Sequence, residues 1–361
     1  MQLNFSKKSP HIGLDIGHSR IKVILMERTP LGWKILNAVT AATPTDSMSE
    51  GVVTNPSAIA EVIKTLLRDH KITASLVDIS VSSSTVVVRT VLMPKMTEEV
   101  LRKSIRFEVG RYIPNNVDDS YIEFEIVKDA PDNQMEVMIV AAPRDLVNSR
   151  IAACELAGLE VDSVDLEPFA TYRSVIESDT LYGWGEKTLA LVDIGARSTK
   201  VSVVSNGKFM MTRAIGVGGS TFSEALSAFF KIPMPDAEIG KSQLDLTNLL
   251  GEQTTENPPL RVLQPHLEEM LRELRRSLNY FQAQANENVS QAPVTHLVLS
   301  GGGAMMTGMA EYLAKKLDLK VMTIGILDNP RFVSASSELG SGLYLAVASG
   351  LAMRNTAPLV A

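Results

Sequence analysis

The feature that most constrains the fold of this chain is a repeated segment. Asp15–Val23 reads Asp-Ile-Gly, four variable residues and then Lys-Val, and Asp193–Val201 has the same frame. An apolar run precedes each copy and a β-branched run follows it, which predicts a strand, a tight turn and a second strand. Because the copies lie near the starts of the two halves of the chain, the repeat indicates a duplicated architecture.

The tip of each predicted hairpin carries one carboxylate and one glycine. Backbone N–H groups at a turn opened by glycine form a concavity that suits phosphate oxygens. Asp15 and Asp193 can each hold a magnesium ion, directly or through water. One copy alone could be an ordinary hairpin turn, but two copies in one frame favour a phosphate clamp that closes on a nucleotide from both sides.

Length and composition set the class of protein. A chain of 361 residues suits two domains, or two domains with an insertion, and its 45% apolar content allows sizeable cores. The net charge of −6 gives no reason to expect nucleic acid as a partner. The single cysteine, Cys154, fits a reducing compartment and a buried core position. Since no signal peptide, long apolar run or amphipathic tail is found, we expect a cytoplasmic protein without its own membrane anchor.

The order of predicted elements indicates an α/β fold with an inserted unit. Strands and a helix opened by Asn55-Pro56 form the first half of an α/β domain. From Thr85 to about Asp162 the order changes to β-α-β-β-α, without a glycine-rich phosphate loop. We therefore expect a first domain over residues 1–84 and 163–188, an insertion over residues 85–162, and a second domain over residues 189–361. Its last helix, predicted from Glu338 to Met353, returns toward the first domain.

Two further glycine-rich turns stand before predicted helices. Gly218 and Gly219 precede a helix, and Gly301, Gly302 and Gly303 follow a buried strand. Glycines at such a position let the backbone approach a flat ring or a phosphate without obstruction by side chains.

These features together resemble a known superfamily. The two Asp-Gly hairpins, the Glu167-Pro168 helix start and the glycine turn near the end of the chain are similar to those of the actin, Hsp70 and sugar-kinase superfamily. The inserted unit resembles that of the cell-division protein FtsA. The motifs Met93–Met96 and Phe107–Pro114, and the segment Leu274–Phe281, resemble the type IV pilus assembly protein PilM family. The resemblance implies an actin/Hsp70-like duplicated nucleotide-binding fold with an FtsA-like subdomain, called 1C.

The resemblance also implies roles for individual residues. Glu167 falls where relatives place the residue that orients water or magnesium, although it could equally cap its helix. Arg197 could pair with phosphates or point to solvent, and Gly240 weakens the helix between the ribose-side residues by about 1 kcal/mol. The implied ATP and Mg²⁺ site comprises Asp15, Gly17, His18, Ser19 and Lys22 in the first hairpin, Asp193, Gly195, Ala196, Arg197 and Ser198 in the second, Gly218 and Gly219, Glu238 and Lys241 near ribose and base, and Gly301, Gly302 and Gly303 near adenine.

The partner implied by the resemblance is the short cytoplasmic N-terminal tail of PilN. The protein would then be peripheral to the inner membrane through its partners, with contacts to other pilus platform proteins and a possible homo-oligomer. We expect the tail to lie as a strand or extended peptide in a groove between the first domain and its insertion. Candidate lining residues are Met93, Met96, Phe107 and Tyr112, for which plain core packing is the alternative.

Other functions use the same phosphate clamp. A small-molecule kinase would need a catalytic acid in a substrate pocket, and an FtsA-like filament-forming ATPase would need a membrane tether. Because Glu167 is the one residue identified for positioning water, we expect ATP binding with at most slow hydrolysis.

Overall fold

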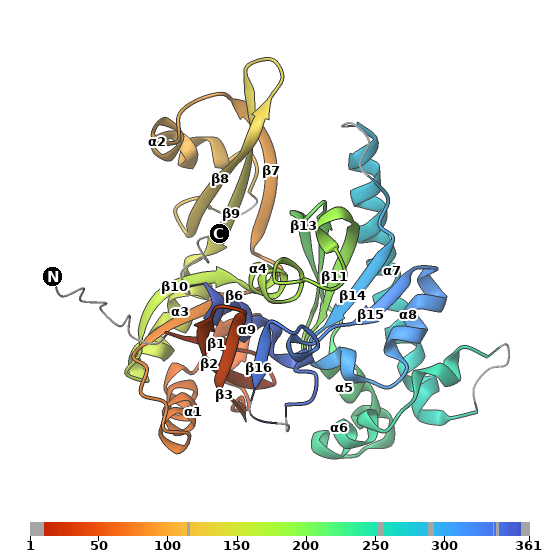
Figure 1. Ribbon diagram of the computed structural model, residues 1–361. Coiled ribbons are helices and arrows are strands. Elements are labelled where there is room, and N and C mark those ends of the chain that lie inside the picture. The colour runs from red at the N-terminus through yellow and green to blue at the C-terminus, as the bar shows by residue number, and fades with distance from the viewer. Residues whose placement is uncertain are drawn as a thin grey trace.

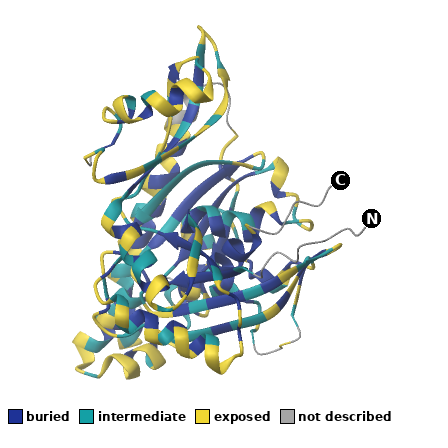
Figure 2. Cartoon of the chain, turned by 90° about the vertical axis from the view of Figure 1, so that its left-hand side faces the viewer, coloured by how far each residue is buried: buried dark blue, intermediate teal, exposed yellow. Residues whose placement is uncertain are grey.

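The computed structural model describes residues 11–113, 116–251, 256–287, 292–334, 336 and 339–354. The expectations for Met1–Pro10, Pro114, Glu338 and the tail beyond Arg354 lie outside these residues. The chain forms two α/β domains side by side, with a smaller unit that projects from the first (Figure 1). Buried residues concentrate in the strands and between the domains, and exposed residues follow the outer helices (Figure 2).

The first domain is built on a sheet whose central hairpin is the first copy of the repeat. Strand β1 is antiparallel to β2, with Asp15 opposite Lys22, and parallel to β6 on its other side. The hairpin predicted at Asp15–Val23 is therefore confirmed. The strand order across the sheet is β10 (Glu160–Leu166), β6 (Leu76–Val81), β1 (His11–Ile16), β2 (Arg20–Thr29), β3 (Gly32–Ala42) and β16 (Phe332–Ser334).

The second domain repeats this arrangement. Strand β11 is antiparallel to β12, with Asp193 opposite Lys200, and parallel to β14. Reading from the third strand of each hairpin unit, β13-β12-β11-β14-β15 has the same order and directions as β3-β2-β1-β6-β10, which confirms the duplication. The strands are β13 (Lys208–Ile215), β12 (Thr199–Ser205), β11 (Thr188–Ile194), β14 (His296–Ser300) and β15 (Lys320–Thr323).

Amphipathic helices cover the sheets. Helix α1 (Pro56–Asp69) starts where the side chain of Asn55 accepts a hydrogen bond from the Ala58 N–H, and it buries Ile59, Ile63 and Leu66. None of the described helices is both long and apolar enough to cross a membrane. The second domain carries α5 (Gly219–Phe230), α6 (Met234–Ser242), α7 (Pro258–Glu287) and α8 (Met309–Leu317).

Two short helices pass between the domains, α4 (Glu167–Tyr172) and α9 (Ala346–Met353). Gly350 brings their backbones together, since a Cβ there would lie only 1.8 Å from the Ala170 carbonyl oxygen. Helix α9 begins at Ala346, so the described part of the chain just before it, residues 339–345, does not belong to the predicted α-helix. Gly340 and Gly342 have φ of 55° and 71°, left-handed values that a helix does not accommodate.

The inserted subdomain has a core of its own. Its three-stranded sheet has the order β7-β9-β8, and α2 covers one face. The elements are β7 (Val87–Pro94), α2 (Glu98–Val109), β8 (Ser120–Ala130) and β9 (Gln134–Pro143). Helix α3 (Arg144–Leu156) and the start of strand β10 fall within residues 85–162, where the inserted unit was expected, but both pack with the first domain. Ala153 and Cys154 pack in the first-domain core and β10 pairs with β6, because their apolar faces match that core.

The close contact between α4 and α9 predicts that Gly350→Ala destabilises the fold, whereas Gly240→Ala, which lies outside this contact, stabilises it. We expect Gly350→Ala to lower the free energy of unfolding by about 1–3 kcal/mol, because the methyl group overpacks the helix crossing. Gly240→Ala in α6 is the matched control. A Cβ there meets no atom within 4 Å, so this variant should gain about 0.5–1 kcal/mol. Urea unfolding of both variants measures the difference, and equal effects would contradict the close helix contact.

Candidate functional site

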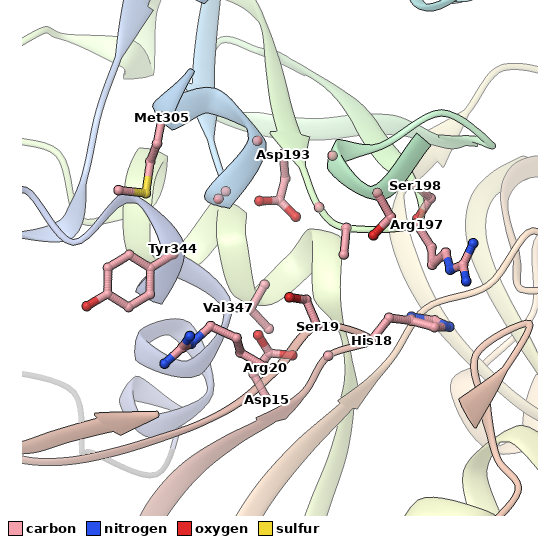
Figure 3. Close-up of a pocket in the computed structure, with 18 of the residues that line it drawn as sticks. Asp15, His18, Ser19, Arg20, Asp193, Arg197, Ser198, Met305, Tyr344 and Val347 are labelled. Carbon is pink, nitrogen blue, oxygen red and sulfur yellow. The ribbon is translucent and has the colours of Figure 1, made fainter. Parts of the chain in front are cut away.

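A cavity of about 490 Å³ lies between the two domains, where the tips of both repeat hairpins meet. Asp15 and Asp193 point into it from opposite sides, as Figure 3 shows. All predicted nucleotide-site residues line this cavity except Gly218. The lining also includes Glu167 from α4 and residues from α6 and from the turns before α8 and α9.

The first hairpin supplies a closed turn and an ion pair. The Gly17 N–H donates to the Arg20 carbonyl oxygen at 3.2 Å, and Thr43 Oγ1 donates to the Gly17 carbonyl oxygen at 2.6 Å. Lys22 Nζ lies 2.5 Å from Asp15 Oδ2, so the charge of this carboxylate is already paired. Burial lowers the pKa of His18, outweighing the attraction of Glu167, so its imidazole is neutral at pH 7.

The second hairpin makes a different pairing. Its turn closes in the same way, with the Gly195 N–H donating to the Ser198 carbonyl oxygen at 3.0 Å. Lys200 faces Asp193 in the strand register, but its Nζ lies 2.6 Å from Oε2 of Glu167 in the other domain. Lys200 was not predicted as a site residue. The repeat contained the signal, because Lys200 occupies the frame position of Lys22.

Of the two hairpin aspartates, Asp15 has an ion-pair partner and Asp193 has none in the part of the chain that the structure describes. Its residue is 8% exposed, and among the described residues no hydrogen bond or ion pair to its carboxylate is found. Burial raises its pKa, and the negative charges of Glu167 and Asp15 raise it further. The positive charge of Lys200 opposes this shift without cancelling it. A buried carboxylate in this state gains most from a bound cation, so the oxygen donors of Asp193 and Asp15 fit a hydrated Mg²⁺ ion.

Glu167 is the first residue of α4, and its side chain turns toward Lys200. No side-chain capping hydrogen bond is present at this helix start, so the observed interaction is the ion pair and not a cap. Burial pushes the pKa of Glu167 upward, but the positive charges of Lys200, Arg150 and Lys22 outweigh it and hold the pKa below its ordinary value. The same pair, opposed by burial, raises the pKa of Lys200. Both groups are charged at pH 7.

The triple glycine has two packing positions and one open position. A Cβ on Gly301 would lie 2.5 Å from Asp193 Oδ1, and one on Gly303 would lie 2.3 Å from Ile194 Cγ2. A Cβ on Gly302 meets no atom within 4 Å. The outer glycines therefore bring the 3₁₀ turn Gly302–Met305 against the second hairpin, and Gly302 keeps the backbone accessible from the cavity.

Gly218 packs against the second hairpin and does not line the cavity. A Cβ on it would lie 2.4 Å from the Ala196 carbonyl oxygen, and the Gly219 N–H donates to the Gly195 carbonyl oxygen at 2.9 Å. The start of α5 thus packs directly on the second hairpin. Gly219 lines the cavity as predicted, whereas Gly218 is a packing residue.

Helix α6 brings a second ion pair to the cavity. Lys241 Nζ lies 2.7 Å from Glu238 Oε1 and donates to the Gly219 carbonyl oxygen at 3.0 Å. The helix continues through Gly240, so the predicted weak point does not separate these two residues. Arg197 forms an ion pair with Glu224 of α5 at 2.6 Å and remains largely exposed.

The cavity has two ends with different linings. His18 and Arg197 lie toward one end, and Met305 and Tyr344 lie toward the other, where the Arg20 side chain also extends (Figure 3). Met305 and Tyr344 were not predicted because they carry no motif and reach the cavity only through the turns that precede them. The further lining residues missed by the sequence analysis are Arg20, Thr40, Ser220, Ser242, Met306, Ala346 and Val347.

The residues predicted for a partner groove do not share one surface. Met93 is 2% exposed in the inserted subdomain core, so its predicted place in a groove is wrong. Met96 and Tyr112 pack partly buried against the same core, while Phe107 is 84% exposed on α2. The hydrophobic spacing along α2 fits core packing for the buried members.

A groove of about 350 Å³ does lie at the junction of the first domain, its insertion and the second domain. The edge strands β7 and β13 border it, and Lys200 lines both this groove and the larger cavity. Its other lining residues are Val81, Ser82, Ser83, Ser84, Val86, Val87, Val88, Arg89, Leu166, Pro168, Thr212, Arg213 and Ala214.

Comparison with known proteins agrees with this architecture. A solved structure of a PilM-PilN type IV pilus biogenesis complex aligns with a TM-score of 0.82 and 26% identity, over 96% of this chain and 99% of that chain. MreB 5 of Spiroplasma citri bound to AMPPNP shares the fold, with a TM-score of 0.53 and 12% identity over 96% of both chains.

The sequence comparisons give relatives and a family. The cell-division protein FtsA of Neisseria meningitidis serogroup B is 27% identical over 202 residues, which is 52% of this chain. The aligned part spans about half of that relative, 47% of its length. The family model described as type IV pilus assembly protein PilM matches residues 13–356. This chain therefore belongs to the type IV pilus assembly protein PilM family.

Proposed function

We propose that this chain is the cytoplasmic ATP-binding component of the type IV pilus inner-membrane platform, and that it holds the N-terminal tail of PilN. Family membership supports the role in pilus assembly. The similar solved structure, a PilM-PilN complex, supports PilN as the partner. Through PilN the protein would be peripheral to the inner membrane and would link the platform to the assembly machinery.

The single observation that carries ATP binding is the meeting of both Asp-Gly hairpins in one cavity. Their turns, with the start of α5, surround the end of the cavity that holds His18 and Arg197, where Lys22 and Lys200 offer positive charge to phosphates. The other end carries Met305 and Tyr344, which suit a flat base. The solved structure of MreB 5, which shares the fold, is described as bound to AMPPNP, and this supports nucleotide binding.

Magnesium fits the carboxylates that face the phosphates. Asp193 and Asp15 would hold the hydrated ion, and the ion would neutralise charge on the β- and γ-phosphates. Since Asp15 is already paired with Lys22, Asp193 carries the main electrostatic contribution.

Replacement of Asp193 tests the magnesium site. We expect Asp193→Asn to weaken ATP binding in the presence of Mg²⁺ about tenfold, or about 1.4 kcal/mol. With EDTA the variant should bind ATP at least as well as the wild type, because a carboxylate that repels phosphate has gone. Asp318→Asn, at an exposed left-handed helix end where Asn is tolerated, is the control. Calorimetric titration with and without Mg²⁺ separates the two cases, and equal losses in both would contradict the assignment.

Glu167 is the candidate for positioning a water molecule against the terminal phosphate. Its lowered pKa keeps it ionised at neutral pH, and its ion pair with Lys200 fixes its side chain at the cavity. A carboxylate held by a buried lysine is a weak proton acceptor, which favours slow turnover over fast hydrolysis.

Turnover experiments test this role. We expect Glu167→Gln to reduce single-turnover phosphate release about 10²-fold while ATP affinity stays near the wild-type value, because Gln keeps the size and a contact with Lys200. In the wild type the rate should stay constant from alkaline pH down past the ordinary Glu value and fall only as pH drops through the lowered pKa. A variant with the wild-type rate, or a wild type without turnover, would show that Glu167 is not catalytic.

We propose that the PilN tail binds in the junction groove, the groove of about 350 Å³ between the first domain, its insertion and the second domain. Edge strands β7 and β13 offer backbone groups for an added strand, and a row of valines offers apolar contacts. Arg89, Arg213 and Lys200 make the groove positive, which suits a peptide with apolar side chains and a carboxylate. Because Lys200 also lines the ATP cavity, peptide and nucleotide should influence each other's affinity.

A peptide titration tests the groove. We expect a synthetic PilN N-terminal tail to bind the ATP-loaded protein, and Arg89→Glu to weaken it about tenfold or more through like-charge repulsion. Arg111→Glu, an exposed arginine of the same subdomain outside the groove, should bind like the wild type. Removal of ATP should also weaken the peptide. If Phe107→Ala abolishes binding and Arg89→Glu does not, the tail lies on α2 instead.

A further inference from the structure

A second group of metal-ligating side chains lies outside the ATP cavity, at the β10 side of the first sheet. His11 begins β1, Asp78 lies in β6 and Asp162 lies in β10. His11 Nδ1 is 3.6 Å from Oδ2 of Asp78 and 3.9 Å from Oδ2 of Asp162. One ligand atom from each residue falls within 4.8 Å of the other two. The proposed function uses none of these residues.

Asp162 lies at a β-bulge of β10. Strand β10 pairs Val161 with Val77 and then Ser163 with Asp78, so the register skips Asp162. Bulges commonly re-aim a side chain. At this bulge, Oδ2 of Asp162 lies 3.9 Å from Nδ1 of His11.

The three residues differ in burial in a manner that suits a bound ion. The Asp78 side chain is fully buried, and its Oδ1 accepts a hydrogen bond from Ser163 Oγ at 2.5 Å. The His11 side chain is 15% exposed and that of Asp162 is 44% exposed. The buried carboxylate is thus held in place, while the exposed one leaves a path for an ion and a water molecule. A hydrogen bond from Ser163 to a ligand is the usual outer support of a metal site.

We propose that His11, Asp78 and Asp162 bind one divalent transition-metal ion of the zinc class. One imidazole nitrogen and two carboxylate oxygens, completed by water, match the ligands and number found in open zinc sites. Bonds of about 2.0–2.2 Å in a tetrahedral site place ligand atoms about 3.3–3.6 Å apart. The pair His11–Asp78 is already near this separation, and rotation of the Asp162 side chain, which is 44% exposed, would bring its Oδ2 closer to His11.

The ligand types also select the metal. Mg²⁺ and Ca²⁺ prefer oxygen ligands alone, whereas imidazole favours zinc and related ions. An ion at this place would join three adjacent strands of the first sheet, β1, β6 and β10. Strand β1 leads directly to Asp15, so the ion would stabilise the strand that carries the first phosphate hairpin.

Cobalt titration tests the site with the full chain. Co²⁺ replaces Zn²⁺ in such sites and reports its ligands by visible absorption. We expect the metal-free wild type to give a saturable absorption band at a ratio of one ion per chain, which Zn²⁺ removes and millimolar Mg²⁺ does not. His11→Ala and Asp162→Asn, at the less buried ligands, should each weaken Co²⁺ binding about 10–100-fold. Zn²⁺ should raise the melting temperature of the wild type and not of His11→Ala.

His18→Ala is the matched control, because this histidine lies among the carboxylates of the ATP cavity. It should keep the Co²⁺ band and the Zn²⁺-dependent rise in melting temperature. Loss of the band in His18→Ala with retention in His11→Ala would place the ion in the ATP cavity and overturn the proposal. A wild type without a band would show that these three side chains do not bind such an ion.

Discussion

The buried ion pair between Lys200 and Glu167 is the interaction on which the site depends most. It joins the second hairpin to helix α4, and hence one domain to the other, at the wall of the cavity. Removing one partner of such a pair leaves an uncompensated buried charge and costs about 3–5 kcal/mol. Because Lys200 pairs with Glu167, it does not pair with Asp193, whereas Lys22 pairs with Asp15. The two hairpins therefore share one sequence pattern but differ in ion pairing, and the unpaired carboxylate lies on the second.

Much of the fold could be predicted from the sequence because its signals are local. The two Asp-Ile-Gly copies, the helix start at Asn55-Pro56 and the alternating strands each depend on neighbouring residues, and the structure contains the corresponding elements. The resemblance to a known family, added to the repeat, indicated most of the residues that line the cavity. Lys200 was not among the predicted residues, although it occupies the repeat position of Lys22, which was predicted.

The remainder depends on contacts between distant segments. Met305 faces the cavity because Gly301 and Gly303 allow its turn to pack against the second hairpin. Tyr344 faces it because Gly342, with a left-handed φ, turns the chain before α9. Met93 and Phe107 have similar apolar character in the sequence, yet one is buried under α2 and the other is exposed on it. The extra residue at Asp162 has no sequence signature, because a bulge is recognised only after two strands have been paired.

The position of β16 and α9 affects the order in which the chain can fold. Both come from the C-terminal part of the sequence, yet β16 pairs with β3 at the edge of the first sheet and α9 packs on β1 and β2. During synthesis the first domain thus emerges with an unpaired strand edge and an uncovered sheet face. Such contacts between distant segments form slowly, and an open edge invites association with other chains. The first sheet is therefore complete only after β16 and α9 have been synthesised.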